Sequence, residues 1–299
     1  MLSDASRGQI RATATGATVR HTAPERIYRV KLGVPPLPLQ QVVGDILGSI
    51  DDLIENNRRR VEVLEEMARA IYREWFVRFR YPGHEDVPLI DSALGPIPEG
   101  WTFRKLDDLV RLVKETVDPS TLDPETPAVG LEHIPRQRIT LDDWGAAGSQ
   151  GSRKAVFTKG DVLFGKIRPY FHKVSVAPVD GICSTDAIVI RPEASHWGQV
   201  VLVASSPDFV AHATQTSNGT KMPRADWKVI GQWSVAVPPT NVAEVFTAIA
   251  RDHLGLAEKF MLENRSLIAL RDLLLPKLVT GQVDMSALDL DALVEDRVA

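Results

Sequence analysis

The chain has 299 residues, a net charge of −4, and 44% hydrophobic and 25% charged residues, a composition typical of a globular protein of one large or two small domains. No apolar run approaches the roughly 20 residues of a membrane helix, and the N-terminus lacks the apolar core of a signal peptide, so we expect a cytoplasmic protein that does not bind a membrane. The one cysteine, Cys183, excludes an intramolecular disulfide framework and cysteine-rich zinc sites.

The first predicted element of any length is a helix that follows a proline stop. Pro35 and Pro36 cannot lie inside a helix but can precede one, so residues 1–34 form a separate segment with a short strand-like stretch. From about residue 39 to residue 77, apolar residues recur at helical spacing, with a polar interruption in the middle. The pattern predicts a helix of about 57 Å within residues 35–80.

The next region, residues 81–237, has the pattern of a globular α/β or α+β domain. Apolar, β-rich stretches separated by polar loops with glycine or proline predict a mixed or antiparallel sheet. The predicted strands are Ala155–Phe157, Asp161–Phe164, Val174–Ala177, Ala187–Ile190 and Trp233–Val237. Two short helices are predicted at Trp197–Ser205 and Pro207–Thr214.

A second long helix is predicted within residues 238–282. Its apolar stripe extends from about Asn241 to Leu275, and Pro276 should end or kink it. Residues 283–299 are predicted to be an acidic tail, because the last eighteen residues contain five acidic side chains against Arg297.

The two helical regions belong to an internal repeat with an offset of 203 residues. Pro35-Pro36 recurs as Pro238-Pro239, and the register holds over about sixty residues without a gap. A repeat of this length indicates duplication of a whole structural unit. The other matched pairs are Gly16 with Gly219, Ile27 with Ile230, Ile46 with Ile249, Leu53 with Leu256, Leu64 with Leu267, Met67 with Leu270 and Ile71 with Leu274.

Two amphipathic helices of this length can bury their apolar stripes against each other, which one helix alone cannot do. The repeat therefore favours an antiparallel, coiled-coil-like pair with approximate two-fold symmetry. The alternative is that each helix packs separately on a globular core. The residues expected to hold the helix pair together, or to form a subunit interface, are Leu64, Met67, Ile71, Trp75, Leu267, Leu270 and Leu274.

The sequence contains no convincing catalytic or metal-binding constellation. The glycine-rich stretch at residues 145–154 lacks the order of a phosphate-binding Walker loop. Cys183 has no paired histidine in the sequence pattern and is interpreted as a small core residue. The spacing of the histidines does not match metal-ligand motifs, and these residues are His84, His133, His172 and His196. We therefore expect no catalytic residue, no metal and no cofactor.

Two segments have the composition of binding surfaces. Residues 150–230 contain ten Lys and Arg against six Asp and Glu, which permits contact with phosphates. The first basic segment, residues 162–173, brings Lys166, Arg168, Tyr170, His172 and Lys173 close together, and the first four share a face if the strand continues through Pro169. The second basic segment, residues 214–226, is a polar loop with Asn218, Thr220, Lys221 and Arg224. Such residues suit phosphate and base-edge contacts, and the alternative is an edge strand and an ordinary surface turn.

These segments and several others resemble the specificity subunits of type I restriction–modification systems. The resembling stretches are IDDLIENNRRR at residues 50–60, LEEMARAIYREWF at 64–76, LGPIPEGW at 94–101, GLEHIPRQRITLDDWG at 130–145, DVLFGKIRPYF at 161–171, STDAIVIRP at 184–192, NGTKMPRADW at 218–227 and LRDLLLPKLVTGQ at 270–282. Together they span nearly all of residues 34–282, in the order typical of the family.

The resemblance implies a DNA-binding subunit that is not itself catalytic. Such proteins contain two target-recognition domains and long helices that separate them and bind two methyltransferase subunits, and restriction subunits join this core. Here the resemblance covers one complete recognition domain within residues 81–237, whereas residues 1–34 correspond to the last part of another. We therefore expect a half-type subunit that recognises one half-site per chain, or two as a homodimer, with residues 1–34 disordered or loosely docked.

The other interpretation of the sequence is a coiled-coil interaction protein whose middle domain binds another protein or RNA. A third, a free-standing nuclease or methyltransferase, requires catalytic residues that the sequence pattern does not contain.

Overall fold

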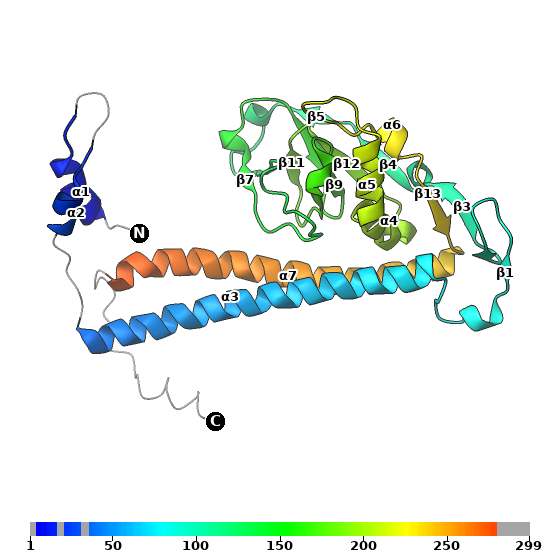
Figure 1. The fold of residues 1–299 in the computed structure, drawn as a ribbon, viewed down its shortest axis with the longest axis horizontal. Coiled ribbons are helices and arrows are strands. Elements are labelled where there is room, and N and C mark those ends of the chain that lie inside the picture. Colours follow the sequence, from blue (N-terminus) through cyan, green and yellow to red (C-terminus); the bar gives the residue numbers. More distant parts are fainter. Residues whose placement is uncertain (1–3, 17–20, 31–35, 280–299) are drawn as a thin grey trace. The chain divides into compact units, whose positions relative to one another are not determined.

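The computed structural model describes residues 4–16, 21–30 and 36–279 (Figure 1). The chain divides into two compact units. Unit 1 combines the residues up to Glu55 with those from Ser266 onward, and unit 2 comprises Asn56–Arg265. The boundaries fall inside the two long helices, whereas the domain boundaries predicted from the sequence follow the helix ends.

Unit 2 contains two larger sheets. The first is antiparallel, with the strand order β10 (Val174–Val176), β9 (Val162–Gly165), β12 (Ala187–Pro192) and β4 (Val110–Val113). The second is mixed, because β11 and β6 are parallel, and its order is β5 (Thr116–Val117), β8 (Lys154–Phe157), β11 (Gly181–Cys183), β6 (Pro127–Val129) and β7 (Gly145–Ala146). Two smaller pairs join β1 (Leu89–Ile90) to β2 (Ile97–Pro98) and β3 (Thr102–Lys105) to β13 (Ser234–Val237). The predicted α+β architecture is confirmed.

The antiparallel sheet is covered on both faces, and this explains why β9 is apolar at every position. Successive side chains of a strand point to opposite faces. Val162 and Phe164 belong to the core that includes Phe209 of the helical layer, whereas Leu163 belongs to the core that includes Phe157 of the mixed sheet. All four residues of β9 are buried. The domain therefore has three layers: helices, antiparallel sheet and mixed sheet.

The helical layer consists of α4 (Trp197–Ala204), α5 (Pro207–Gln215) and α6 (Trp227–Ile230). The first two were predicted from the sequence, and every residue of α4 is buried. At Gly198 an added Cβ would lie 2.8 Å from the Ala250 side chain and 3.1 Å from the Thr247 Cα. Glycine is therefore required where α4 packs directly on α7 (Thr240–Val279).

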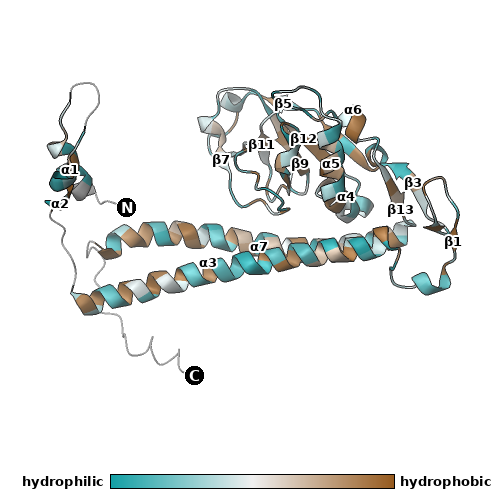
Figure 2. Cartoon of the chain, viewed as in Figure 1, coloured by the Kyte–Doolittle hydropathy of each residue, from teal (hydrophilic) through white to brown (hydrophobic). Residues whose placement is uncertain are grey.

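The long helices α3 (Leu37–Tyr72) and α7 are antiparallel, as predicted, and α3 continues into a π-helical turn at Arg73–Val77. In unit 2, Val61 packs against Ala257 and Met261. In unit 1, Val43 packs against Leu278, and apolar and polar residues alternate along both helices (Figure 2).

Some details of the predicted helices differ from the structure. Met67 and Leu270 are 46% and 44% exposed, so they do not hold the helix pair together. Trp75 belongs to the buried core of the globular domain and Ile71 packs against that core, so the end of α3 contacts the domain. Helix α7 also does not end at Pro276 but continues to Val279, because a proline in the last turn removes only one backbone donor. Three members of the predicted set are partly buried: Leu64 in the Val61 cluster, Leu274 in the Val43 cluster, and Leu267 on α7.

The described part of the N-terminal segment repeats a helical part of the domain. It contains α1 (Asp4–Thr13), a Thr15–His21 bridge and α2 (Pro24–Tyr28). Moved by 203 residues, these match α5, the Asn218–Arg224 bridge and α6, and the starts of α3 and α7 match as well. The expected strand equivalent to β13 falls on residues 31–34, which lie outside the described residues. Of the two expectations for this segment, disorder is wrong for residues 4–16 and 21–30, and loose docking stays a prediction.

Candidate nucleic-acid interface

The two basic segments predicted from the sequence lie next to each other. Ile167 forms an isolated β-bridge with Arg224. The Arg168 N–H donates to the Pro223 carbonyl at 2.8 Å, and the Ala225 N–H donates to the Lys166 carbonyl at 2.9 Å. Segments about fifty residues apart in the sequence therefore form one continuous surface.

The first basic segment is a strand followed by a tight turn, and the prediction of a strand through Pro169 is wrong. Strand β9 ends at Gly165, and Pro169–Phe171 forms a single 3₁₀ turn. Proline has no N–H for a ladder hydrogen bond, and the flanking residues Arg168 and His172 have left-handed φ values of 49° and 52°. The side chains therefore do not alternate along one strand face.

This turn contains an unusual concentration of left-handed backbone. Four non-glycine residues in the described parts of the chain have positive φ: Arg168, His172, Gln137 and Phe79. The first three are neighbours, because the Gln137 N–H donates to the His172 carbonyl at 2.8 Å. Each such residue costs roughly 1–3 kcal/mol, and such strain is concentrated at functional sites. The turn is therefore a functional candidate on geometric grounds alone.

The side chains of this turn divide into outward and inward groups. Tyr170 is 52% exposed, and the half-buried Arg168 has a buried Nε that contacts no acceptor among the described residues. His172 is turned inward, and its Nε2 donates to the Ser205 carbonyl at 2.9 Å. The Lys173 ammonium donates to the Leu131 carbonyl. His172 and Lys173 are half-buried, and both donate to main-chain carbonyls of this chain, so neither extends freely from the surface as the sequence interpretation expected.

Burial perturbs both inward-facing groups. Desolvation lowers the pKa of His172, the hydrogen bond to Ser205 opposes the change, and the nearby positive charge of Arg69 lowers the pKa further. Desolvation also lowers the pKa of Lys173, and the guanidinium of Arg136 contributes in the same direction.

The second basic segment forms the opposite side of the surface. Asn218 and Arg224 exchange two backbone hydrogen bonds of 3.0 and 2.9 Å around Gly219, whose φ is 96°. The predicted residues of this segment, Asn218, Thr220, Lys221 and Arg224, are all exposed. The Arg224 guanidinium lies 3.5 Å from the Asp186 carboxylate.

A groove of about 470 Å³ lies where the two segments meet. Lys166, Asn218 and Arg224 line it together with Lys114, and apolar residues such as Trp227 complete the wall. Lys114 was missed because it stands alone between strands β4 and β5. Arg136 was also missed, although its guanidinium stacks 4.3 Å from the Phe171 ring centre, because only the fold brings the two residues together.

The chemistry that this surface offers is hydrogen-bond donation and positive charge next to an exposed aromatic ring. Cations and amides of this kind suit phosphates and base edges. The Cys183 thiol is buried, and burial raises its pKa to about 12, so it is not an activated nucleophile. In the described parts of the chain, no cluster of three or more His, Cys, Asp and Glu could hold a metal ion. None of the described helices is long and apolar enough to span a bilayer.

Two proteins of known role are similar in sequence to most of this chain. The MjaIX type I restriction enzyme specificity subunit of Methanocaldococcus jannaschii is 22% identical over 290 residues, which are 91% of this chain and 65% of the relative. The EcoDI specificity subunit of Escherichia coli is also 22% identical, over 253 residues that are 77% of this chain and 56% of the relative. The chain is related to type I restriction specificity subunits. It spans less than two thirds of the length of these two specificity subunits.

A solved specificity subunit shares the fold. The S subunit of the type I restriction–modification system from M. genitalium matches with a TM-score of 0.53 at 14% sequence identity, covering 92% of this chain and 70% of the other. No protein-family model matches the chain. The specificity-subunit fold agrees with a domain connected to a pair of long helices.

Proposed function

We propose that the chain is the DNA-recognition subunit of a type I restriction–modification complex and that residues 81–237 are its target-recognition domain. The convergence of the two basic segments on one groove is the observation that carries the proposal. The half-buried Arg168 and the exposed Arg224 are suited to bidentate contacts with guanine. Tyr170, Lys166 and Lys221, with Asn218 and Thr220, supply the adjoining contacts to bases or phosphates.

The proposal assigns no catalysis to this chain. Methylation and cleavage belong to methyltransferase and restriction subunits, and a cytoplasmic location follows from that role. The long helices are the docking surface for the methyltransferases. Residues that the 203-residue repeat pairs with each other are similarly exposed, which supports this assignment. Leu53 and Leu256 are 39% and 42% exposed, and Met67 and Leu270 are 46% and 44% exposed. Unit 1 contains one residue of each pair and unit 2 contains the other, as two copies of the same partner require.

Selection of duplexes from a randomised DNA library by the full-length chain, with and without its methyltransferase subunit, tests the proposal. We expect enrichment of one short sequence, and salt-dependent binding. Lys221→Gln should reduce the salt slope by about one unit on all sequences. Arg168→Ala should cost about 1–3 kcal/mol and relax the preference at one position. Lys105→Gln, which changes an exposed lysine of β3 outside both basic segments and both long helices, is the matched control.

The same experiment separates the alternatives. Binding of single-stranded RNA or of a protein in preference to duplex DNA would support the coiled-coil interaction protein instead. Sedimentation tests the expectation of one half-site per chain. One copy of this chain with two methyltransferases, bound with full affinity to a split asymmetric site, would refute that part of the proposal.

A further inference from the structure

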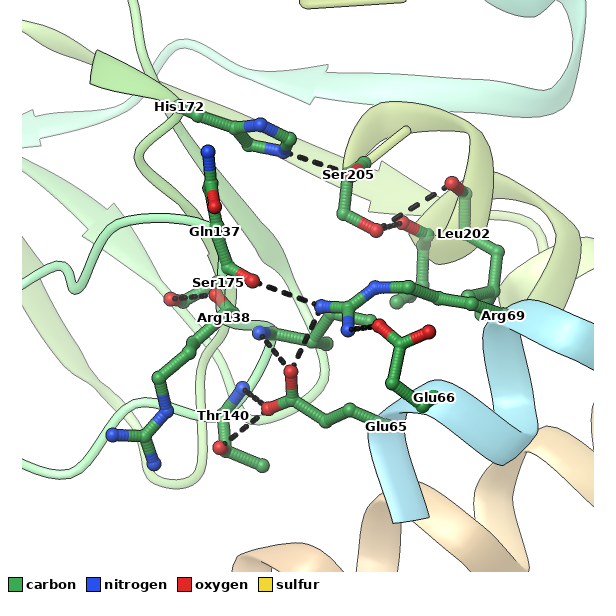
Figure 3. A network of polar contacts seen from close by, with 12 residues as sticks. Glu65, Glu66, Arg69, Gln137, Arg138, Thr140, His172, Ser175, Leu202 and Ser205 are labelled. Carbon is green, nitrogen blue, oxygen red and sulfur yellow. Dashed lines mark hydrogen bonds and ion pairs between the residues drawn. The ribbon is translucent and has the colours of Figure 1, made fainter. Parts of the chain in front are cut away.

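A buried carboxylate joins helix α3 to the domain near the candidate interface. The Glu65 side chain is only 2% exposed, and it accepts hydrogen bonds from the Ile139 N–H at 3.0 Å and from the Thr140 N–H and hydroxyl at 2.9 and 2.7 Å (Figure 3). The Arg69 guanidinium, one turn further along α3, donates to the same carboxylate at 2.9 Å. A buried charge is tolerated only when it is paired and hydrogen-bonded in this way.

The Arg69 guanidinium extends this network towards the turn of the first basic segment. Its Nη2 also donates to the Gln137 carbonyl at 3.0 Å, and its Nη1 donates to Glu66 at 2.6 Å. Gln137 has left-handed backbone and donates its N–H to the carbonyl of left-handed His172. Arg69 is therefore separated from His172 by a single residue.

The loop at residues 136–140 is held against the strand that follows the turn. Arg136 forms an isolated bridge with Lys173, and Thr140 forms one with Val176. Within the turn itself, the His172 N–H donates to the Pro169 carbonyl at 2.8 Å. A hydrogen bond or a bridge makes every step from α3 to the turn, so a continuous series of polar contacts connects Arg69 to the turn.

We propose that Glu65 and Arg69 are positioning residues that hold the turn of residues 168–172 in its strained conformation and so set its sequence preference for DNA. The inference rests on the proposed DNA-binding function and adds that helix α3 takes part in sequence discrimination without touching DNA. Strain at three adjacent residues persists only where the surroundings over-determine it, and the Glu65–Arg69 network supplies that constraint.

Arg69→Gln is the decisive variant. It removes the guanidinium contacts to Gln137, Glu66 and Glu65, while Glu65 keeps its three donors from residues 139 and 140, and glutamine is a good helix former. Glu66→Gln is the matched control, because it neutralises only the exposed carboxylate that accepts from the same guanidinium. Both full-length variants are compared with the parent chain for thermal stability, for binding to random duplex DNA, and for binding to the duplex that the parent chain selects from a randomised library.

We expect Arg69→Gln to retain binding to random DNA and to lose about tenfold of its preference for the selected duplex, the range of one base contact. Glu66→Gln should keep the preference within about twofold. Arg69→Gln and Arg168→Ala should also be non-additive in a double-mutant cycle, because both act through the same turn. A folded Arg69→Gln chain with unchanged preference, or strict additivity with Arg168→Ala, would overturn the inference.

If Arg69→Gln does not fold, Arg69→Lys keeps a positive charge near Glu65 while losing the planar fork, and the same two outcomes apply to it. A parent chain that selects no sequence from the library would instead contradict the proposed function, so the two failures are distinguishable.

Discussion

Replacement of Glu65 by glutamine tests how strongly the buried carboxylate stabilises the domain. The two carboxylate oxygens of Glu65 accept four hydrogen bonds. A glutamine amide can keep the oxygen that faces Thr140, but its NH₂ group then meets two donors, the Ile139 N–H and the Arg69 guanidinium. Each lost bond to a charged group contributes about 1.5–3 kcal/mol, so the loss of two should cost the variant about 3–6 kcal/mol of unfolding free energy.

Urea titration followed by tryptophan fluorescence measures this loss, because all six tryptophans lie in unit 2. Glu66→Gln is again the control. Its side chain is 61% exposed, and an exposed ion pair contributes about 0–1 kcal/mol. Equal midpoints for the two variants would refute the conclusion that the Glu65 network holds the domain on α3.

Three further predictions concern packing and pH. Gly198→Ala should destabilise unit 2 by about 1–3 kcal/mol because the new Cβ overlaps α7. Gly255→Ala is its control, because an added Cβ there has no neighbour within 4 Å, and it should be neutral or stabilise by up to about 1 kcal/mol. A lower melting temperature for both variants would contradict this prediction. Val61→Asp should disrupt the helix pair, whereas Met67→Asp should leave its circular dichroism and melting temperature nearly unchanged, since Val61 is fully buried and Met67 is not. Because burial lowers the pKa of His172 below its usual 6.5, its contribution to stability is complete above pH 6.5 and is lost as the pH falls below it; His172→Asn should flatten the pH dependence of the urea midpoint between about pH 7 and 5.

The elements that could be predicted from the sequence are those with strong periodicity. The apolar stripes placed α3 and α7 within a few residues of their observed ends, and β9 and β12 were found because each contains a continuous apolar run, Val162–Phe164 and Ala187–Ile190. Strand β11 was missed because it is a three-residue strand that starts at Gly181. There an added Cβ would lie 2.4 Å from the Pro127 carbonyl oxygen, so the glycine that hides the strand in the sequence is what lets it pair with β6.

The candidate surface was predicted in composition but not in geometry. The sequence alone shows where basic residues are concentrated, whereas the pairing of Ile167 with Arg224 depends on contacts between segments far apart in the sequence. His172 turns inward from a left-handed backbone position, and a single histidine in a basic stretch is too weak a signal to predict that conformation. Glu65 was missed for a similar reason, because a single glutamate on an amphipathic helix is typical of a solvated face.

The helix–bridge–helix arrangement occurs twice in this chain, so the copy at residues 4–28 can serve as an internal reference for the copy at residues 207–230. The same pair of backbone hydrogen bonds closes the Thr15–His21 bridge and the Asn218–Arg224 bridge, with distances between 2.9 and 3.0 Å in both. Helix α2 has no buried residue, whereas α6 buries Trp227 and Ile230. Amide exchange at His21 and Arg224, measured in one sample, therefore separates the intrinsic strength of the bridge from the protection that tertiary packing adds at residues 218–224.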